Sequence, residues 1–254
     1  GQPYFSRTYQ GFRLVRGAIT PDSGLVLCGG GGASAYNDYA GGWLMRVDRD
    51  GTPLFTTTYT TSQAEPFWIR DVSLIGDSSY ILVGFAGTEW TTNNKLVYQV
   101  VGPTGEVLWG GLDSGAWWDD TAYRLNRAER AQDGTVVVCG VHLIMNLGGV
   151  YGPGYTARVG HEEGSYLTPF TSSASGSGPL IAVIEDVAAT SDGGFVCLGY
   201  AGNYIIAFKV GPLGAVTWSR SLYAVGVDNF IMHVAEGENG SSYAAVQAYS
   251  GTFR

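Results

Sequence analysis

The chain has 254 residues, of which 45% are hydrophobic and 14% are charged. This balance supplies enough apolar surface for a core and carries too little charge for an intrinsically disordered chain. The formal net charge is −8 with only two lysines, so we expect no nucleic-acid partner, because binding to phosphates requires a basic surface. No apolar run approaches the roughly 20 residues of a membrane-spanning helix, and we therefore expect no membrane insertion.

Glycine provides 39 of the residues, about twice its usual share of roughly 7%. One short pattern recurs along the chain: a turn that begins with Asp, followed by an apolar strand that ends at Gly. The four clear copies are DSGLVLCG (22–29), DSSYILVG (77–84), DGTVVVCG (133–140) and DGGFVCLG (192–199), and a degraded fifth copy is GSSYAAVQ (240–247). Asp and Gly tolerate the backbone angles of tight turns, so each copy predicts a hairpin.

In chain order, the first copy predicts strands at 16–20, 22–29, 43–47 and 51–59. The second copy predicts strands at 70–75, 77–84, 96–101 and 105–112, and the third at 127–131, 133–140, 155–159 and 164–170. The fourth copy predicts strands at 185–190, 192–199, 204–210 and 214–223, whereas the fifth supplies only a first and a second strand within 228–250. Four antiparallel strands that recur every 48–59 residues are typical of the blades of a β-propeller.

We therefore predict an all-β chain in which residues 1–254 form a single domain, a five-bladed β-propeller of four-stranded antiparallel blades. The blades are expected at about 11–59, 66–112, 121–170, 182–223, and 228–254 together with 1–10. GPTGEVLW (102–109) and GPLGAVTW (211–218) are interpreted as turns between third and fourth strands, each followed by a Trp that packs between blades. Asp48 and Asp50 are interpreted as part of an ordinary turn and not of a calcium loop, so no metal site is expected.

The unit that runs from DGGFVCLGY to AFKVGPLGAVTWSRSLY (192–223) resembles the propeller repeats of secreted bacterial and archaeal surface proteins. GPTGEVLW also resembles the Gly-x-x-x-Trp element of quinoprotein-like propellers. The resemblance implies a propeller fold and an extracellular or cell-surface location. We expect no cofactor, because the chain has five copies of the repeat and quinone-dependent dehydrogenases have eight blades.

The last blade is expected to contain both chain ends and to lack one strand. The N-terminal segment GQPYFSRTY (1–9) aligns with the fourth strands of the other copies, Gly1 with Gly214 and Phe5 with Trp218. Three interpretations remain open: the chain is a piece of a longer one, the blade closes irregularly with three strands, or a neighbouring chain fills the gap by adding a strand. The residues expected at this closure or assembly edge are Tyr4, Phe5, Tyr9, Tyr243, Val246 and Tyr249.

A ring of alternating charge is expected on the first strands, which line the central channel of a propeller. Its members stand six residues before each hairpin Asp and are Arg16, Asp71, Arg127, Asp186 and, with one residue of slack, His233. One interpretation of this ring is an ion or small-ligand site. The other is a set of mutually paired charges that fills the channel, since buried charges need partners.

No catalytic residues are expected. The adjacent carboxylates at 119–120, 162–163 and 185–186 point to opposite faces if they lie on strands. Five-bladed glycosidases place three carboxylates on inner strands, and Asp71 and Asp186 resemble two of them, but Arg16 and Arg127 intervene and no third is visible. No nucleophile elbow of the form Gly-x-Ser-x-Gly is present.

Aromatic, glycine-rich loops supply the candidate ligand residues, which are Tyr36, Tyr39, Trp90, Trp117 and Trp118. Such side chains either stack on sugar rings or pack beneath their own loops. Cys28, Cys139 and Cys197 are interpreted as small buried hydrophobic residues with no disulfide. Residues 239–241, Asn-Gly-Ser, match the N-glycosylation acceptor pattern on an exposed hairpin.

The function expected from these features is that of a non-catalytic extracellular structural or interaction propeller. It is expected to self-assemble into a polymer or filament through the incomplete last blade, so the partner is the chain itself or another surface protein. The alternative is a lectin-like propeller that binds glycans through the loop aromatics. A glycosidase-type enzyme ranks below both.

Overall fold

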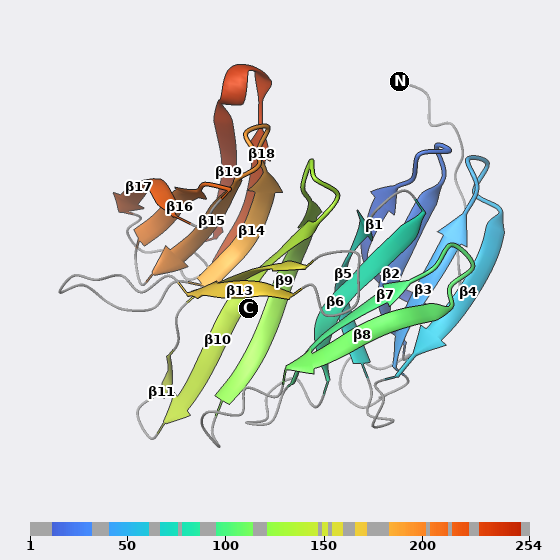
Figure 1. The fold of residues 1–254 in the computed structure, drawn as a ribbon. Helices are drawn as coiled ribbons and strands as arrows, with labels where there is room; N and C mark the ends of the chain where they lie inside the picture. The colour runs from blue at the N-terminus through green and yellow to red at the C-terminus, as the bar shows by residue number, and fades with distance from the viewer. Residues whose placement is uncertain are drawn as a thin grey trace. The chain divides into compact units, whose positions relative to one another are not determined.

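The computed structural model describes residues 12–31, 41–60, 67–75, 78–86, 95–113, 121–146, 149–151, 154–159, 166–171, 183–201, 204–212, 215–223 and 229–249. The described elements are β-strands apart from one short 3-10 turn (Figure 1), which confirms the all-β class. The chain divides into two compact units, Gly1–Ala122 and Tyr123–Arg254, and each is described by itself. Among the described residues, no helix is long and apolar enough to cross a membrane.

The first unit contains two antiparallel four-stranded sheets, each with its strands in sequence order. The first sheet comprises β1 (Phe12–Ile19), β2 (Leu25–Gly31), β3 (Gly42–Val47) and β4 (Pro53–Tyr59). The second comprises β5 (Phe67–Ile75), β6 (Ser79–Ala86), β7 (Lys95–Val101) and β8 (Val107–Asp113). These sheets correspond to the first two predicted blades.

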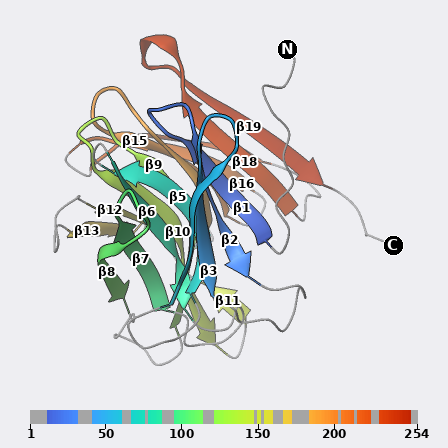
Figure 2. The same cartoon turned by 90° about the vertical axis from the view of Figure 1, so that its right-hand side faces the viewer.

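The second unit contains three sheets. The third sheet of the chain comprises β9 (Thr121–Arg130), β10 (Val136–Asn146), β11 (Gly149–Tyr151), β12 (Gly154–Val159) and β13 (Tyr166–Thr171). The fourth comprises β14 (Val183–Ala189), β15 (Phe195–Ala201), β16 (Tyr204–Val210) and β17 (Val216–Tyr223). The fifth is a hairpin of β18 (Asn229–Glu236) and β19 (Ser242–Tyr249), coloured red in Figure 2.

The third sheet differs from the prediction at its second strand. The repeat predicts that this strand ends at Gly140, but β10 continues to Asn146 and pairs with the short strand β11. The residues after Gly140 are Val-His-Leu-Ile-Met, a run with high β-propensity. The strand therefore extends beyond its pairing with β12, which ends at Val141.

β1, β5 and β14 each contain a β-bulge. They begin before the strand segments predicted at 16–20, 70–75 and 185–190, and within one residue of the predicted blade starts at 11, 66 and 182. The register shifts between Leu14 and Arg16 in β1, between Ile69 and Asp71 in β5, and between Ile184 and Asp186 in β14. A bulge disturbs the alternation of side chains along a strand, which hides the residues before it from a two-residue hydrophobic pattern. Each of these bulges lies directly before a residue of the predicted charge ring.

The glycine that ends the repeat lies opposite the bulge. Gly84 and Gly199 each pair with the residue just before the bulge. A Cβ atom at Gly84 would stand 1.8 Å from the carbonyl oxygen of Trp68, and one at Gly199 would stand 2.0 Å from that of Val183. Only glycine fits at these positions, because the backbone of the bulged strand passes too close for a side chain.

The degraded fifth copy has neither the glycine nor the bulge. The Gly237 amide donates a hydrogen bond to the Ser241 carbonyl as the Thr190 amide does to that of Gly194. The fifth copy therefore begins at Asn239, one residue earlier than the sequence alignment gives, and Val246 takes the place of Gly84 and Gly199. β18 and β19 pair without a register shift, from Asn229 with Tyr249 to Glu236 with Ser242. The fifth copy therefore lacks both the terminal glycine in its sequence and the β-bulge in its backbone.

The turn in GPTGEVLW requires its second glycine. Gly105 has a φ of +89°, in the left-handed region that favours glycine, and its amide donates a 3.1 Å hydrogen bond to the carbonyl of Gly102. The Tyr59 hydroxyl, on the outer strand of the first sheet, donates a 2.9 Å hydrogen bond to the carbonyl of Gly105. Trp109 packs edge-on against Tyr98 of its own sheet, with ring centroids 5.8 Å apart. In this pair of sheets Tyr59 reaches the neighbouring sheet, and the ring contact of Trp109 lies within its own sheet.

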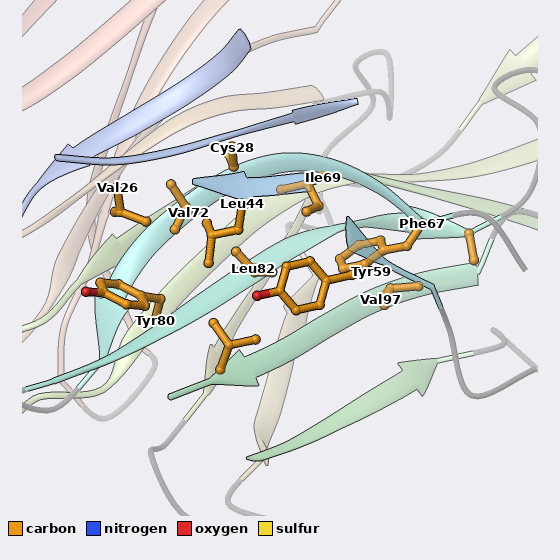
Figure 3. Packing of buried hydrophobic residues seen from close by; sticks show 12 residues of the cluster. Val26, Cys28, Leu44, Tyr59, Phe67, Ile69, Val72, Tyr80, Leu82 and Val97 are labelled. Atoms are coloured by element: carbon orange, nitrogen blue, oxygen red, sulfur yellow. The ribbon is translucent and has the colours of Figure 1, made fainter. Parts of the chain in front are cut away.

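The core of the first unit lies between its two sheets (Figure 3). Its buried residues are Val26, Cys28, Leu44, Tyr59, Phe67, Ile69, Val72, Tyr80, Leu82, Ala86, Val97 and Val101. The second unit has a comparable cluster of Val137, Cys139, Ile184, Val187, Phe195, Cys197, Phe208 and Val210. All three cysteines are free and buried, which confirms their interpretation as small core residues. Each fully buried Leu, Ile or Phe contributes roughly 1.5–3 kcal/mol.

Candidate functional site: charged inner strands and an exposed strand edge

Asp186 joins three neighbouring first strands of the second unit. Its side chain is only 2% exposed, and its Oδ1 lies 3.0 Å from Nε of Arg127 on β9. Its Oδ2 accepts a 2.8 Å hydrogen bond from the backbone amide of Val234 on β18 and lies 3.5 Å from Nδ1 of His233. One carboxylate therefore links β9, β14 and β18.

Asp71 occupies the corresponding place in the first unit. It is buried directly after the β5 bulge, and its Oδ1 accepts a 2.9 Å hydrogen bond from the amide of Val72. Burial raises the pKa of the Cys28 thiol well above its usual value, the negative charge of Asp71 raises it further, and Arg16 opposes this effect. Arg16 on β1 and Asp71 on β5 therefore both act on one buried thiol of β2.

The structure brings the side chains of Arg127 and His233 together around the carboxylate of Asp186. Arg127 is 24% exposed and His233 is 52% exposed, whereas Asp186 is inaccessible to a solute. This buried carboxylate is placed to hold the three strands together. The predicted ring of five residues belongs to two separate units, so a common channel, and a ligand within it, remain predictions.

The second strand of the fifth sheet is exposed on both of its faces, because successive residues of a strand point to opposite sides. In β19, Tyr243 is 65% exposed and Val246 is 36% exposed, and every residue between them is exposed as well. Tyr249 also lies on β19. Within the described part of the chain, β19 pairs with β18 alone.

Several predicted site residues lie outside the described residues. They are the edge candidates Tyr4, Phe5 and Tyr9 and the loop candidates Tyr36, Tyr39, Trp90, Trp117 and Trp118. Their assignment to an assembly edge or to a ligand site remains a prediction.

The hairpin aspartates stabilise their own turns. Oδ1 of Asp22, Asp133 and Asp192 accepts a hydrogen bond from a threonine hydroxyl of the same turn at 2.5–2.6 Å. Two of them also pair with the third strand of their sheet, Asp22 with Arg46 and Asp192 with Lys209. The Lys209 hydrogen bond, followed by that of Thr190, lowers the pKa of Asp192 to about 2.

Sequence reasoning did not identify the contact between the fourth and fifth sheets. The carboxylate of Glu236 accepts hydrogen bonds from the Ser191 amide at 2.7 Å and from the Ser191 hydroxyl at 2.9 Å. The signal was present as a Ser directly before the hairpin Asp-Gly and a Glu at the end of the next first strand. Only the tertiary structure pairs them, because 45 residues separate the two positions.

The Asp48 turn has the expected local pattern. Its Oδ1 accepts hydrogen bonds from the amides of Asp50 at 2.9 Å and Thr52 at 2.8 Å. In the described ranges, no group of three His, Cys, Asp or Glu side chains is arranged to hold a metal ion.

Comparison with known proteins relates the chain to others through its fold. No family model and no curated protein matches the sequence. Among solved structures, the chain is similar to a polysaccharide lyase of family PL25, an ulvan lyase bound to -[GlcA(1-4)Rha3S]-, with a TM-score of 0.51 and 10% sequence identity. This match covers 87% of the chain and 57% of the lyase, so the chain spans little more than half of that protein.

Two further solved structures are similar at lower scores. An endo-arabinase from Bacteroides thetaiotaomicron has a TM-score of 0.46 and 14% identity, with 93% of each chain covered. Prolyl oligopeptidase B from Galerina marginata has a TM-score of 0.47 and 11% identity, with 95% of this chain and 33% of the peptidase covered.

The repeated four-stranded antiparallel sheets, together with the likeness to the lyase, place the chain in the β-propeller class. At 10% identity the likeness concerns the fold alone. The number of blades remains a prediction.

Proposed function

We propose that this chain is a non-catalytic structural or interaction propeller of the extracellular space or cell surface, which self-assembles through the edge of β19. The exposure of β19 is the observation that carries the proposal. The location rests on the resemblance of residues 192–223 to surface-protein repeats.

β19 differs from the second strands of the other sheets. Cys28 in β2, Val83 in β6 and Leu198 in β15 are buried, and each of these strands pairs with a third strand. Ala245 stands at the same distance from its hairpin turn, yet it is exposed. β19 therefore occupies the position of a second strand, which is interior in the other sheets, but its residues are as exposed as those of an edge strand.

The free side of β19 can accept another strand. The Gly237 amide donates a 2.7 Å hydrogen bond to the Ser241 carbonyl, which directs the polar backbone groups of Ser241 towards β18. By the alternation of an antiparallel ladder, those of Ser242, Ala244 and Val246 point away from β18. An edge of this kind, with no Lys or Pro along it, is a template for strand addition.

The partner we propose is a second copy of the chain, which contributes its residues 1–9. This segment has the sequence pattern of a fourth strand, and the fifth sheet has two described strands where three of the other sheets have four. Donation of a strand from one copy to the next is a heterologous contact, which continues into a fibre when the rotation between copies does not close a ring, and a fibre is the form we propose.

The experiment measures particle mass by light scattering over a range of concentrations, with electron microscopy of the same samples. We expect the unaltered chain to form fibres and Val246→Lys to remain monomeric, because a lysine blocks an edge strand. Leu222→Lys on β17, an exposed apolar position away from β19, is the matched control and is expected to assemble normally. A monomeric unaltered chain, or fibres of Val246→Lys equal to those of the unaltered chain, would exclude the proposal.

The glycan-binding alternative rests on the predicted loop aromatics, and the described aromatic group at their end of the second sheet packs on Phe85, which is only 2% exposed. Trp68 stacks on Phe85 with an interplanar angle of 14° and ring centroids 6.2 Å apart, and Arg70 lies 5.2 Å above the Phe85 ring. This group lies at the end of the second sheet from which the predicted loop containing Trp90 leaves. A glycan array separates the two functions: sugar binding that Trp117→Ala and Trp118→Ala abolish, with assembly unchanged, would favour the alternative.

A further inference from the structure

We propose that Asn239 is an acceptor for an N-linked glycan. The inference shares with the proposed function the assumption of an extracellular location and is otherwise independent of it. Asn239-Gly240-Ser241 is the one Asn-x-Ser/Thr sequence in the 254 residues.

The position is sterically open. Asn239 lies in the 3-10 turn Glu238–Gly240 at the tip of the hairpin between β18 and β19. Asn239, Gly240 and Ser241 are all exposed. A Cβ atom placed at Gly240 would meet no atom within 4 Å, so the middle of the acceptor sequence faces open space.

The backbone at Asn239 differs from that of the other hairpin turns. Asn239 has φ 62° and ψ 26°, and Gly240 has φ 73°, so two successive residues are left-handed. In the turns at 22–23, 133–134 and 192–193, only the second residue has a positive φ. The fifth hairpin therefore presents its Asn in a conformation that the hairpin aspartates do not adopt.

Within the described part of the chain, the side chain of Asn239 makes no hydrogen bond that holds its turn. The aspartates at this position in the first, third and fourth sheets accept hydrogen bonds from turn residues. In the fifth hairpin the Gly237 amide closes the turn on the Ser241 carbonyl, and no hydrogen bond of the Asn239 amide is found within the described residues. The amide nitrogen is therefore available to a transferase without loss of a turn contact.

The modification requires a glycosyl donor activated on a lipid phosphate or pyrophosphate. The amide nitrogen of Asn239 forms a bond to the anomeric carbon of the first sugar, and the bond from that carbon to the phosphate oxygen breaks. The lipid phosphate leaves with the bonding electron pair, and one amide proton passes to a base of the transferase. No oxidant or reductant is needed, because every atom keeps its oxidation state.

The test is mass spectrometry of the tryptic peptide that contains 237–241, from protein isolated from its natural source. We expect the peptide to carry an added mass of whole sugar residues. In a homologous secretion host, Ser241→Ala should remove it, whereas Ser241→Thr, which keeps the acceptor pattern, and Ser242→Ala, which lies outside it, should retain it.

The variants Ser241→Ala and Ser241→Thr leave Asn239 unchanged. This matters because Asn is one of the few residues that adopts a left-handed conformation readily. Recovery of the peptide only in unmodified form, from a source that modifies a reference acceptor sequence, would overturn the inference. Fibre formation by Ser241→Ala distinguishes the two proposals, because assembly through β19 does not require the glycan.

Discussion

At the scale of the residue, a hairpin Asp forms an ion pair with a basic residue on the third strand of its sheet. Asp192 accepts hydrogen bonds from Lys209 at 2.6 Å and from the Thr190 hydroxyl at 2.6 Å, and Asp22 has the same partners in Arg46 and Thr20. The pairing joins the first hairpin of a sheet to its third strand. It therefore stabilises the order of strands within a sheet.

The Asp192 pair predicts an acid-dependent loss of stability. Its folded pKa of about 2 lies below the unfolded value of roughly 3.9, so its contribution is present above about pH 4 and is lost as the pH falls towards 2. Because the Asp192 side chain is 52% exposed, we expect at most about 1 kcal/mol.

Urea titrations from pH 2 to pH 7 measure this effect. The free energy of unfolding of the native chain should exceed that of Asp192→Asn at neutral pH, and the two should converge near pH 2. Lys209→Met serves as the control and should reduce the pH-dependent difference. A difference that does not change with pH would contradict the assignment.

Gly84 predicts a large single-residue effect. In Gly84→Ala the new Cβ meets the carbonyl oxygen of Trp68, which is backbone and cannot rotate away. We expect a loss of about 3 kcal/mol or more in the free energy of unfolding. Gly211→Ala is the matched control, because its nearest atom is at 3.4 Å and its φ is not positive, so its effect should lie within about 1 kcal/mol of zero.

At the scale of the element, the bulge is the feature that positions the charged residues. β1, β5 and β14 each change register directly before Arg16, Asp71 or Asp186. β-Bulges re-aim side chains, and here the aspartates after them are buried. In β14 the buried Asp186 contacts β9 through Arg127 and β18 through the Val234 amide. The bulge therefore places the side chain that connects the neighbouring sheets.

Asp186→Asn tests this arrangement. It removes the charge that pairs with Arg127 and weakens the acceptor of the Val234 amide, so we expect a loss of about 1–3 kcal/mol in the free energy of unfolding. Hydrogen exchange at the Val234 amide should accelerate, which a general loss of stability would not single out. In a double-mutant cycle with Arg127→Met, the two losses should add to more than the loss in the double mutant.

At the scale of the whole molecule, the two units have separate cores, and each core contains cysteine. Cys28 lies in the first unit, and Cys139 and Cys197 lie in the second. Burial raises the pKa of the Cys28 and Cys197 thiols well above the usual value, and a neighbouring buried aspartate adds to each shift. Both factors oppose formation of the reactive thiolate.

These thiols predict the pattern of chemical labelling. At neutral pH the native chain should react with a thiol reagent far more slowly than the unfolded chain, because labelling requires opening of the core. Peptide mapping at partial denaturant should show Cys139 and Cys197 becoming reactive together, and Cys28 at its own denaturant concentration. Rapid labelling of the native chain would show that the cores are not closed as described.

Much of the fold could be predicted from local sequence. The Asp turn, the apolar second strand and the terminal Gly mark hairpins, and the second, third and fourth strands lie within a few residues of their predicted bounds, apart from the extension of β10. The predicted blade bounds place the starts of β1, β5 and β14 correctly, but the strand pattern recognises only the residues after each bulge, because the bulge shifts the side-chain alternation. The position of Arg127, Asp186 and His233 on neighbouring strands was anticipated by counting from the turns, but their contacts were not.

The sequence by itself determined the all-β class, the repeat, the turn positions and the burial of the three cysteines, because each follows from short-range pattern and hydrophobicity. The tertiary structure decided which polar groups meet, since the contacts of Asp186 with Val234 and His233 join residues 48 and 47 positions apart. It also decided why the repeat ends in glycine, because the close approach of Trp68 to Gly84 arises only when the bulged strand packs beside it. The tertiary structure also decided the exposure of β19, because the burial of a strand depends on the strands and sheets beside it and not on its own composition.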